Sequence, residues 1–256
     1  VRDPFSALAG LLGTPSPAMA GGPPFQGGVV GLASYELADR VEALGLDRQA
    51  AWPDLAAARY PAVLAFDRQE RQVLAIGRGA SPDEAQVRAR AALAWLEGAP
   101  RAAYRERLTD GLVNTDGEAY EAAVADVVAR IHAGEIFQAN IARSWTGRLL
   151  AAATPFDLFA RLINQSAAPF AAYLRLPGLA LVSNSPERFV QVREGMVETR
   201  PIKGTRPRGR TLEADAALAD ELLASEKDRA ENLMIVDLMR NDLARVCAPG
   251  SVRAPE

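Results

Sequence analysis

The chain has 256 residues, of which 49% are hydrophobic and 24% are charged, a composition typical of a globular protein with one large domain or two modest ones. Its formal net charge of −3 argues against a general attraction to nucleic acid or to anionic membranes. With one histidine and one cysteine, a zinc site of His and Cys ligands is excluded, and any metal is expected to be a hard cation on carboxylates.

The sequence starts at Val1 without a basic-then-apolar leader, and no apolar run approaches the roughly 20 residues of a membrane span. We therefore expect neither secretion nor membrane attachment. The single cysteine, Cys247, can form no internal disulfide, which fits a reducing compartment, and the expected location is the cytoplasm.

Residues 1–98 are predicted to form an N-terminal portion of sheet and helix. A small, β-branched and apolar run at 27–35 indicates a packed strand. The runs 60–66 and 71–76 flank a polar Asp-Arg-Gln-Glu turn and predict a hairpin. Apolar residues at helical spacing predict a helix over 82–96, which a glycine follows.

Residues 99–114 carry mixed charges and few large apolar side chains, so they are predicted to be a linker. Residues 115–256 then form a second region, which opens with a helix that ends at Gly134. The further elements predicted are strands at 136–145, 170–176 and 179–182, a helix at 155–164, a hairpin of 189–192 with 196–199, and helices at 212–223 and 225–246. Strands in hairpins with helices gathered elsewhere favour an α+β fold of mainly antiparallel sheets over a doubly wound parallel sheet.

The segment Thr199–Arg210, with the sequence TRPIKGTRPRGR, holds five cations and no anion, and we call it the basic loop. Its prolines and glycines prevent a helix and indicate a rigid, shaped loop. Clustered cations attract a polyanionic ligand. They also lower the pKa of a lysine among them, so that a larger fraction of that lysine is present as the free amine. Lys203 is therefore a candidate nucleophile. The alternatives are a solvated basic loop without chemistry and a module that binds anions or nucleic acid through this loop.

Glu187 precedes the basic loop in the segment SPERF, between two predicted strands. If 189–192 and 196–199 form a hairpin, the Glu187 carboxyl group and the Lys203 amine emerge at the same open end. A carboxylic acid beside an amine can serve as general acid and nucleophile. A surface ion pair of Glu187 with Arg188 is the alternative.

Asp228 and Glu231 are three residues apart on the predicted helix 225–246, so they share one face and can converge on one cation. A solvated first turn, where acids also suit the helix dipole, is the alternative. Asp237 interrupts the apolar run that follows, and its natural partner is Arg240. We interpret that pair as structural, because a buried charge is rare unless it is paired.

Four segments, in this order, resemble the chorismate-utilising enzymes. They are GEIFQAN at 134–140, SPERF at 185–189, PIKGTRPRG at 201–209 and KDRAENLMIVDLMRNDL at 227–243, with a weaker match from Pro24 to Glu36. The family includes anthranilate synthase component I, isochorismate and salicylate synthases, and aminodeoxychorismate synthase component I. The resemblance implies antiparallel sheets packed orthogonally, with helices outside.

One position separates the members of this family. Anthranilate, isochorismate and salicylate synthases carry alanine where this chain has Lys203, and lysine resembles the aminodeoxychorismate-forming members. In those, the resemblance implies, Lys203 attacks C2 of chorismate while Glu187 protonates the departing C4 hydroxyl. Ammonia then adds at C4 and expels the lysine, giving 4-amino-4-deoxychorismate for para-aminobenzoate and folate synthesis. Anthranilate synthase component I and isochorismate synthase are the alternatives within the family.

The resemblance also implies a cofactor, a partner and further site residues. Glu231 matches a Mg²⁺ ligand, and Asp228 matches a second carboxylate that binds the ion through water, so that Mg²⁺ would hold the ring carboxylate of chorismate. Gly204 and Thr205 match a turn that contacts the substrate. A glutamine amidotransferase subunit or domain would supply the ammonia. The residues that lie where some relatives bind tryptophan as an effector are Pro169, Phe170 and Tyr173.

The sequence also departs from the family pattern. Asn184 stands where the family has serine before Ser-Pro-Glu. The family's His-Leu-Val-Ser strand, its Gly-Ser-Ile-Thr-Gly-Ala-Pro-Lys segment and its remaining magnesium carboxylates do not occur before the sequence stops at Glu256. We therefore expect these residues to be the N-terminal part of a catalytic region, inactive alone, with exposed apolar sheet surface.

Overall fold

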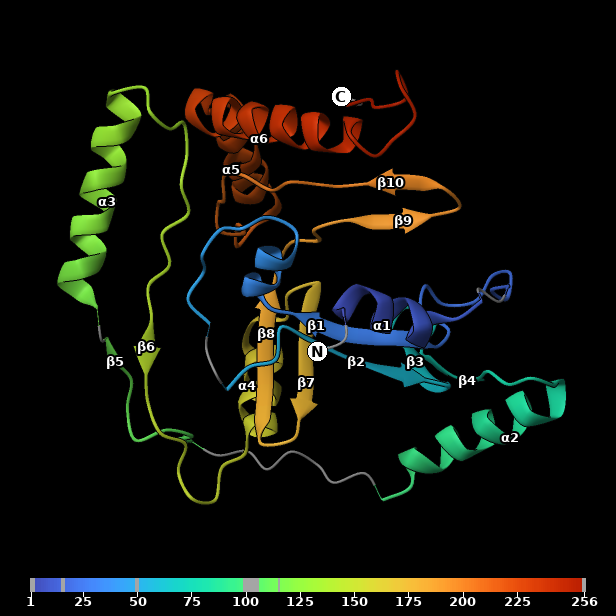
Figure 1. Ribbon diagram of the computed structural model, residues 1–256. Coiled ribbons are helices and arrows are strands. Elements are labelled where there is room, and N and C mark those ends of the chain that lie inside the picture. Colours follow the sequence, from blue (N-terminus) through green and yellow to red (C-terminus); the bar gives the residue numbers. More distant parts are fainter. Residues whose placement is uncertain (1–2, 15–16, 49–50, 99–105, 115, 255–256) are drawn as a thin grey trace. The chain divides into compact units, whose positions relative to one another are not determined.

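A computed structural model describes residues 3–14, 17–48, 51–98, 106–114 and 116–254 (Figure 1). The chain divides into two compact units, Val1–Arg101 and Ala102–Glu256. The division falls inside the segment 99–114 that the sequence predicts as a linker, of which 99–105 lie outside the described residues.

In the described residues, the first unit consists of two antiparallel strand pairs and two helices with short 3₁₀ turns. Its elements are α1 (Pro4–Leu12), β1 (Gly28–Ala33), η1 (Tyr35–Arg40), β2 (Leu55–Tyr60), β3 (Ala62–Asp67), β4 (Gln72–Gly77), α2 (Pro82–Leu93) and η2 (Ala94–Leu96). β1 pairs with β2, and β3 pairs with β4, both antiparallel. The strand at 27–35, the hairpin and the helix over 82–96 are confirmed in outline. The sequence analysis missed α1 and β2, the latter because its Leu-Ala-Ala-Ala-Arg-Tyr carries little β-branched signal.

Local side chains set the ends of these elements. In the β3–β4 hairpin, Asp67 Oδ1 accepts hydrogen bonds from the backbone N–H groups of Gln69 at 2.9 Å and Glu70 at 3.0 Å, which closes the turn. At α2, Ser81 Oγ accepts from the backbone N–H of Glu84 at 3.2 Å, and a proline occupies the first turn. Ala92 on α2 is fully buried, so the helix packs through small residues.

The second unit holds the four motif segments. Its elements are β5 (Val113–Asn114), α3 (Gly117–His132), β6 (Trp145–Thr146), α4 (Pro155–Ser166), β7 (Phe170–Leu176), β8 (Leu179–Ser185), β9 (Gln191–Arg193), β10 (Met196–Glu198), α5 (Leu212–Ala224) and α6 (Glu226–Ala244). Figure 1 shows β7–β8 and β9–β10 as separate hairpins, with α6 beside the second. Every strand pair in the described residues is antiparallel, which confirms the predicted α+β class.

Two predictions for this unit were wrong. The strand predicted over 136–145 is present only as β6, which begins at Trp145. Residues 106–114 are not a free linker, because β5 pairs with β6 and Thr109 forms an isolated bridge with Leu149. Leu108 beside this bridge is buried. A strand as short as β6 needs a partner strand, and the second half of the predicted linker supplies it.

The β7–β8 hairpin packs against α4. A capping box starts α4: Thr154 Oγ1 accepts from the Asp157 backbone N–H at 3.2 Å, and the Asp157 carboxylate accepts from the Thr154 backbone N–H at 2.8 Å. Phe156 and Phe159 of α4 meet Tyr173 of β7, with ring centroids 5.4 and 5.7 Å apart. The hairpin ends at Ser185, so this packing fixes the point from which Glu187 leaves the sheet.

The β9–β10 hairpin carries much exposed apolar surface. It turns through Glu194 and Gly195, both with positive φ, and it confirms in outline the hairpin predicted from 189–192 and 196–199. Phe189 is 79% exposed, Val192 67% and Met196 74%. This agrees with the expectation of exposed apolar sheet surface. No helix within the described ranges is long and apolar enough to cross a membrane.

Candidate active site

The basic loop leaves β10 and passes α5 and α6, where acidic side chains pair with most of its arginines. Arg200 Nε lies 2.5 Å from a carboxylate oxygen of Glu198. The remaining pairs join Arg206 to Glu221 at 2.7 Å and to Asp228 at 3.4 Å, and Arg208 to Asp215 at 2.6 Å. The loop is therefore not the free cationic surface that its composition predicts, because the acids that neutralise it lie on the neighbouring elements.

These ion pairs change the ionisation of the groups that make them. Hydrogen bonds from Arg208, and then one from the Gly209 backbone N–H at 2.7 Å, lower the pKa of Asp215 to about 2. The pKa of Arg206 is raised, chiefly by its hydrogen bond to Glu221. These groups are held in their charged forms at neutral pH, so the ion pairs anchor the loop to α5 and α6.

Lys203 differs from the arginines around it. It is half-buried, and its amine has no hydrogen bond or ion pair with any of the residues that the structure describes. The neighbouring Ile202 donates its backbone N–H to Glu187 Oε1 at 3.2 Å. The Glu187 carboxylate is thus held one residue away from Lys203. The structure therefore places Glu187 against the backbone of the basic loop next to Lys203 in sequence.

The alternative interpretation of Glu187, a surface ion pair with Arg188, is wrong in this structure. Arg188 instead donates to Glu198 on β10, which Arg200 also contacts. These contacts, with the hydrogen bond from Arg200 as the largest cause, lower the pKa of Glu198. Arg188 and Glu198 therefore join the segment that follows β8 to β10. Glu187 is left to face the basic loop.

Gly204 fixes the course of the loop between two helices. Its φ of +72° lies in the left-handed region that favours glycine. A Cβ at this position would stand 2.7 Å from Leu222 Cδ1 of α5 and 2.9 Å from Asp228 Cγ of α6. The backbone that follows Lys203 therefore lies directly against Asp228. Thr205, the other residue predicted in the substrate-contacting turn, is exposed.

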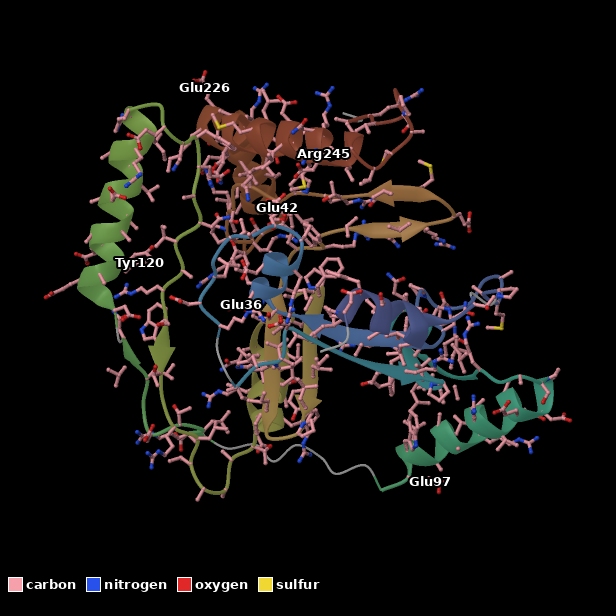
Figure 2. The ribbon with its side chains drawn as sticks, in the orientation of Figure 1. Glu36, Glu42, Glu97, Tyr120, Glu226 and Arg245 are labelled. Atoms are coloured by element: carbon pink, nitrogen blue, oxygen red, sulfur yellow. The ribbon has the colours of Figure 1, made fainter. Side chains whose placement is uncertain are left out.

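The N-terminal half of α6 presents the two predicted metal ligands. Ser225 Oγ accepts from the Asp228 backbone N–H at 3.3 Å and caps the helix. Asp228 and Glu231 are both half-buried, and Arg206 and Gln138 respectively contact their carboxylates. Figure 2 marks the ends of this helix at Glu226 and Arg245.

Gln138 is a site residue to which the sequence analysis gave no role. Its Nε2 donates to Glu231 Oε1 at 3.4 Å across a long sequence separation. The only signal that could have found it is the GEIFQAN motif that contains it. Gln138 lies in the irregular segment after α3, where Arg143 stacks on the rings of Tyr120 and Trp145, 5.5 and 5.0 Å from their centroids.

The donor set suits magnesium better than a metal that needs many protein ligands. Among the described residues, no three or more His, Cys, Asp or Glu side chains gather as a metal cluster. Asp228 and Glu231 offer two carboxylates on one helix face. Mg²⁺ is commonly bound through one or two carboxylates, with water and substrate oxygens completing an octahedron. The residues present therefore fit Mg²⁺.

The structure also describes two other predicted features. Of the residues predicted at an effector site, Pro169 precedes β7, and Phe170 and Tyr173 project from opposite faces of β7. Tyr173 faces the phenylalanines of α4, so its ring is engaged in packing. Asp237 and Arg240 do form the expected ion pair, at 2.9 Å, and both side chains are more than half exposed. That pair therefore contributes little to stability.

A groove lies beside the start of the basic loop. Its volume is about 340 Å³, and it runs between the end of β10 and the C-terminal half of α6. The apolar residues that line it include Val197, Pro201, Val236, Met239 and Leu243. The face of α6 toward the loop is thus polar in its first half and apolar in its second.

Comparison with known proteins identifies the relatives of this chain. Residues 4–256 match the family described as chorismate binding enzyme. Aminodeoxychorismate synthase component 1 from Klebsiella aerogenes is 43% identical over 237 residues, which cover 91% of this chain and 50% of that protein. Anthranilate synthase component 1 from Thermus thermophilus is 38% identical over 268 residues, covering 100% of this chain and 56% of that protein. The chain therefore spans about half the length of the curated relatives that it matches.

A solved structure resembles the fold. The crystal structure of anthranilate synthase component I from Streptococcus pneumoniae TIGR4 superimposes with a TM-score of 0.77 at 24% sequence identity. The match covers 95% of this chain and 55% of that one. At this identity the likeness concerns the fold, and it agrees with the α+β class predicted from the sequence.

Proposed function

The chain belongs to the family of chorismate-binding enzymes, and on that premise we propose that it carries part of the active site of an aminodeoxychorismate synthase component I. The reaction is the conversion of chorismate and ammonia to 4-amino-4-deoxychorismate. The observation that carries the proposal concerns Lys203. Its amine has no partner among the described residues, and the backbone N–H of the preceding residue, Ile202, binds the Glu187 carboxylate. The 43% identity to an aminodeoxychorismate synthase component 1 supports it.

In the proposed mechanism, Lys203 is the nucleophile and Glu187 the general acid. The free amine forms a C–N bond at C2 of chorismate, the ring double bonds shift, and the C4–O bond breaks. Glu187 gives its proton to the departing hydroxyl, which leaves as water. Ammonia then bonds to C4, the double bonds shift back, and the C2–N bond to Lys203 breaks. The Ile202 backbone holds the Glu187 carboxylate beside the loop that carries Lys203, and both bond changes are proposed to occur in one bound geometry.

Mg²⁺ is proposed as the cofactor, and Glu231 and Asp228 are the residues that would hold it. The bound ion would supply positive charge for the ring carboxylate of chorismate. Gln138 fixes the orientation of Glu231 through its hydrogen bond. Gly204 lets the backbone of the basic loop approach Asp228, and it thereby sets the distance between the carboxylates and Lys203.

The ammonia is proposed to come from a glutamine amidotransferase subunit or domain, with which the protein would form a heterodimer or a fusion. The name "component 1" of the relatives supports a multi-component enzyme. A cytoplasmic location is proposed because the chain has a single, unpaired cysteine.

The second candidate is anthranilate synthase component I, and the 38% identity to the Thermus thermophilus protein favours it. Lys203 argues against it, because that branch of the family carries alanine at this position. The hypothesis of a module that binds nucleic acid rested on the positive charge of the basic loop. That charge is largely neutralised, since Arg200, Arg206 and Arg208 are paired with carboxylates.

The test is to incubate the full-length protein with chorismate, Mg²⁺ and ammonium salt and to identify the product by liquid chromatography and mass spectrometry. We expect 4-amino-4-deoxychorismate, and anthranilate as the main product would contradict the proposal. In a second experiment without ammonia, intact-mass analysis should find a chorismate-derived adduct that peptide mapping places on Lys203.

A further inference from the structure

Arg206 stands between two carboxylates that belong to different helices. Its Nε donates to Glu221 Oε1 of α5 at 2.7 Å, whereas its Nη2 lies 3.4 Å from Asp228 Oδ2 of α6. Its Nη1 donates to the Thr205 carbonyl oxygen of its own loop at 3.0 Å. The guanidinium is therefore held more closely by Glu221, which has no role in the proposed reaction, than by Asp228, one of the proposed Mg²⁺ ligands.

The two carboxylates differ in their contact with solvent. The side chains of Asp228 and Arg206 are 18% and 27% exposed, whereas that of Glu221 is 60% exposed. Water and salt screen partly buried charges less than exposed ones, so Asp228 feels the nearby guanidinium more strongly than a surface carboxylate would. A positive charge at this distance from Asp228 opposes the binding of a second cation to the same carboxylate.

The other proposed ligand has a different neighbour. Glu231 Oε1 accepts a hydrogen bond from the neutral amide of Gln138 at 3.4 Å. Within the described residues, no lysine or arginine other than Arg206 forms an ion pair with Asp228 or Glu231. Arg206 is thus the cation whose position can control how strongly the pair of carboxylates attracts a metal ion.

We propose that Glu221 raises the Mg²⁺ affinity of the site by holding the Arg206 guanidinium away from Asp228. The inference rests on the proposed magnesium site. Mg²⁺ and a guanidinium repel each other and bind the same kind of oxygen, so the ion binds more tightly when the guanidinium has another anionic partner. Without Glu221, Arg206 would close the 3.4 Å separation and form a charge-assisted hydrogen bond with Asp228. Glu221 and Arg206 are positioning residues, because both act on the metal through Asp228.

The test is a double-mutant cycle in which isothermal titration calorimetry measures MgCl₂ binding to the full-length protein. Glu221→Ala releases Arg206, and we expect it to weaken Mg²⁺ binding about 10-fold, as for other groups that act on a metal through its ligands. Arg206→Met keeps the aliphatic stem and removes the cation, so it should bind Mg²⁺ about 10-fold more tightly. In the double variant, the loss caused by Glu221→Ala should disappear, because the cation on which Glu221 acts is gone.

Asp220→Ala is the matched control. It removes the same charge from the exposed residue that precedes Glu221 on α5, and Mg²⁺ binding should stay within about 2-fold of wild type. A second readout separates this role from simple support of the fold. Loss of the ion pair should lower the thermal midpoint without added MgCl₂ slightly in both single variants, whereas their Mg²⁺ affinities should change in opposite directions. Arg206→Gln gives the same comparison if Arg206→Met does not fold.

Three results would contradict the proposal, and a fourth would contradict its premise. An equal loss from Glu221→Ala with and without Arg206 would show that Glu221 acts by its own charge. Weaker Mg²⁺ binding in Arg206→Met would show that the guanidinium supports the site. Wild-type affinity in both single variants, with affinity lost in Glu231→Gln, would remove the role of Glu221 and keep the magnesium site. Wild-type affinity in Glu231→Gln would overturn the magnesium site itself.

Discussion

The two halves of the basic loop carry the same types of residue in different surroundings. In Pro201–Thr205, the Ile202 backbone binds Glu187, Gly204 contacts Asp228, and Lys203 has no partner among the described residues. In Arg206–Arg210, Arg206 pairs with Glu221, and Arg208 forms two hydrogen bonds with Asp215, at 2.7 and 2.6 Å. The first half presents an unpaired amine and a backbone that binds a carboxylate, and the second half ties the loop to α5.

The contrast shows that positive charge in a sequence does not distinguish an anchor from a reactive group. The distinction comes from the acid on the facing element, because a paired guanidinium is held in place whereas an unpaired amine is available to a ligand. Substitution of the unpaired Lys203 should therefore affect activity, whereas substitution of residues that hold the loop against α5 and α6 should affect stability.

The largest effect is expected for Lys203→Ala. Removal of the nucleophile should reduce 4-amino-4-deoxychorismate formation by about 1,000-fold or more, with residual turnover shifted to attack of ammonia or water at C2. The free energy of unfolding should change by less than about 0.5 kcal/mol, because Lys203 makes no described contact through its amine. Steady-state kinetics and urea unfolding measure the two quantities. Arg210→Ala, which removes an exposed cation of the same loop, should leave the rate unchanged, and an equal loss in both variants would contradict the nucleophile assignment.

Glu187→Gln should lower the rate about 100- to 1,000-fold by removing general-acid catalysis. The amide oxygen can still accept the hydrogen bond from the Ile202 backbone N–H, so the geometry of the loop should be kept. Unlike Lys203→Ala, this variant should suppress the C2 products as well, because every route needs the C4 hydroxyl protonated as it leaves. Product analysis of the double variant Lys203→Ala with Glu187→Gln checks this, because its C2 products should be lower than those of Lys203→Ala alone. Persistent C2 products in the presence of Glu187→Gln would show that another group is the acid.

Gly204→Ala should destabilise the protein by about 2–3 kcal/mol, since a side chain here combines a left-handed backbone with overlap of Leu222 and Asp228. Gly178→Ala is the matched control, because its φ of +75° is similar and its surroundings are open. The control should lose only about 1 kcal/mol, the backbone part of the effect. Chemical denaturation measures both, and equal losses would mean that the contact with α5 and α6 does not constrain the loop.

The smallest effect concerns pH. The pKa of Asp215 is lowered in the folded state to about 2 from 3.8, so its ionisation stabilises the fold above about pH 4. That contribution is lost as the pH falls through about 2. Asp215→Asn should therefore lower the thermal midpoint slightly at about pH 5 and reduce its fall between about pH 4 and about pH 2. Asp237→Asn, in an exposed pair, should follow the wild-type pH profile, and a wild-type profile in Asp215→Asn would contradict the anchor.

Local patterns in the sequence predicted much of the fold. The β9–β10 hairpin follows from two short apolar runs around Glu194 and Gly195, and α2, α4 and α6 begin where Ser81, Thr154 and Ser225 can cap them. The strand predicted over 136–145 failed because apolar residues alone do not supply a neighbour to pair with. β5 was missed for the same reason, since its partner among the described strands is the two-residue β6.

For the candidate site, too, the sequence predicted some features and tertiary packing decided the others. The motifs by themselves determined that Lys203, Glu187, Asp228 and Glu231 are the residues of interest, because residue type and order along the chain are sufficient to carry the resemblance. The choice of ion-pair partners for the arginines, the role of Gln138 and the position of Arg206 between Glu221 and Asp228 were decided only by the tertiary structure. A hydrogen bond or an ion pair depends on what another part of the chain places within about 3–4 Å, and that distance is set by packing between elements that are remote in sequence.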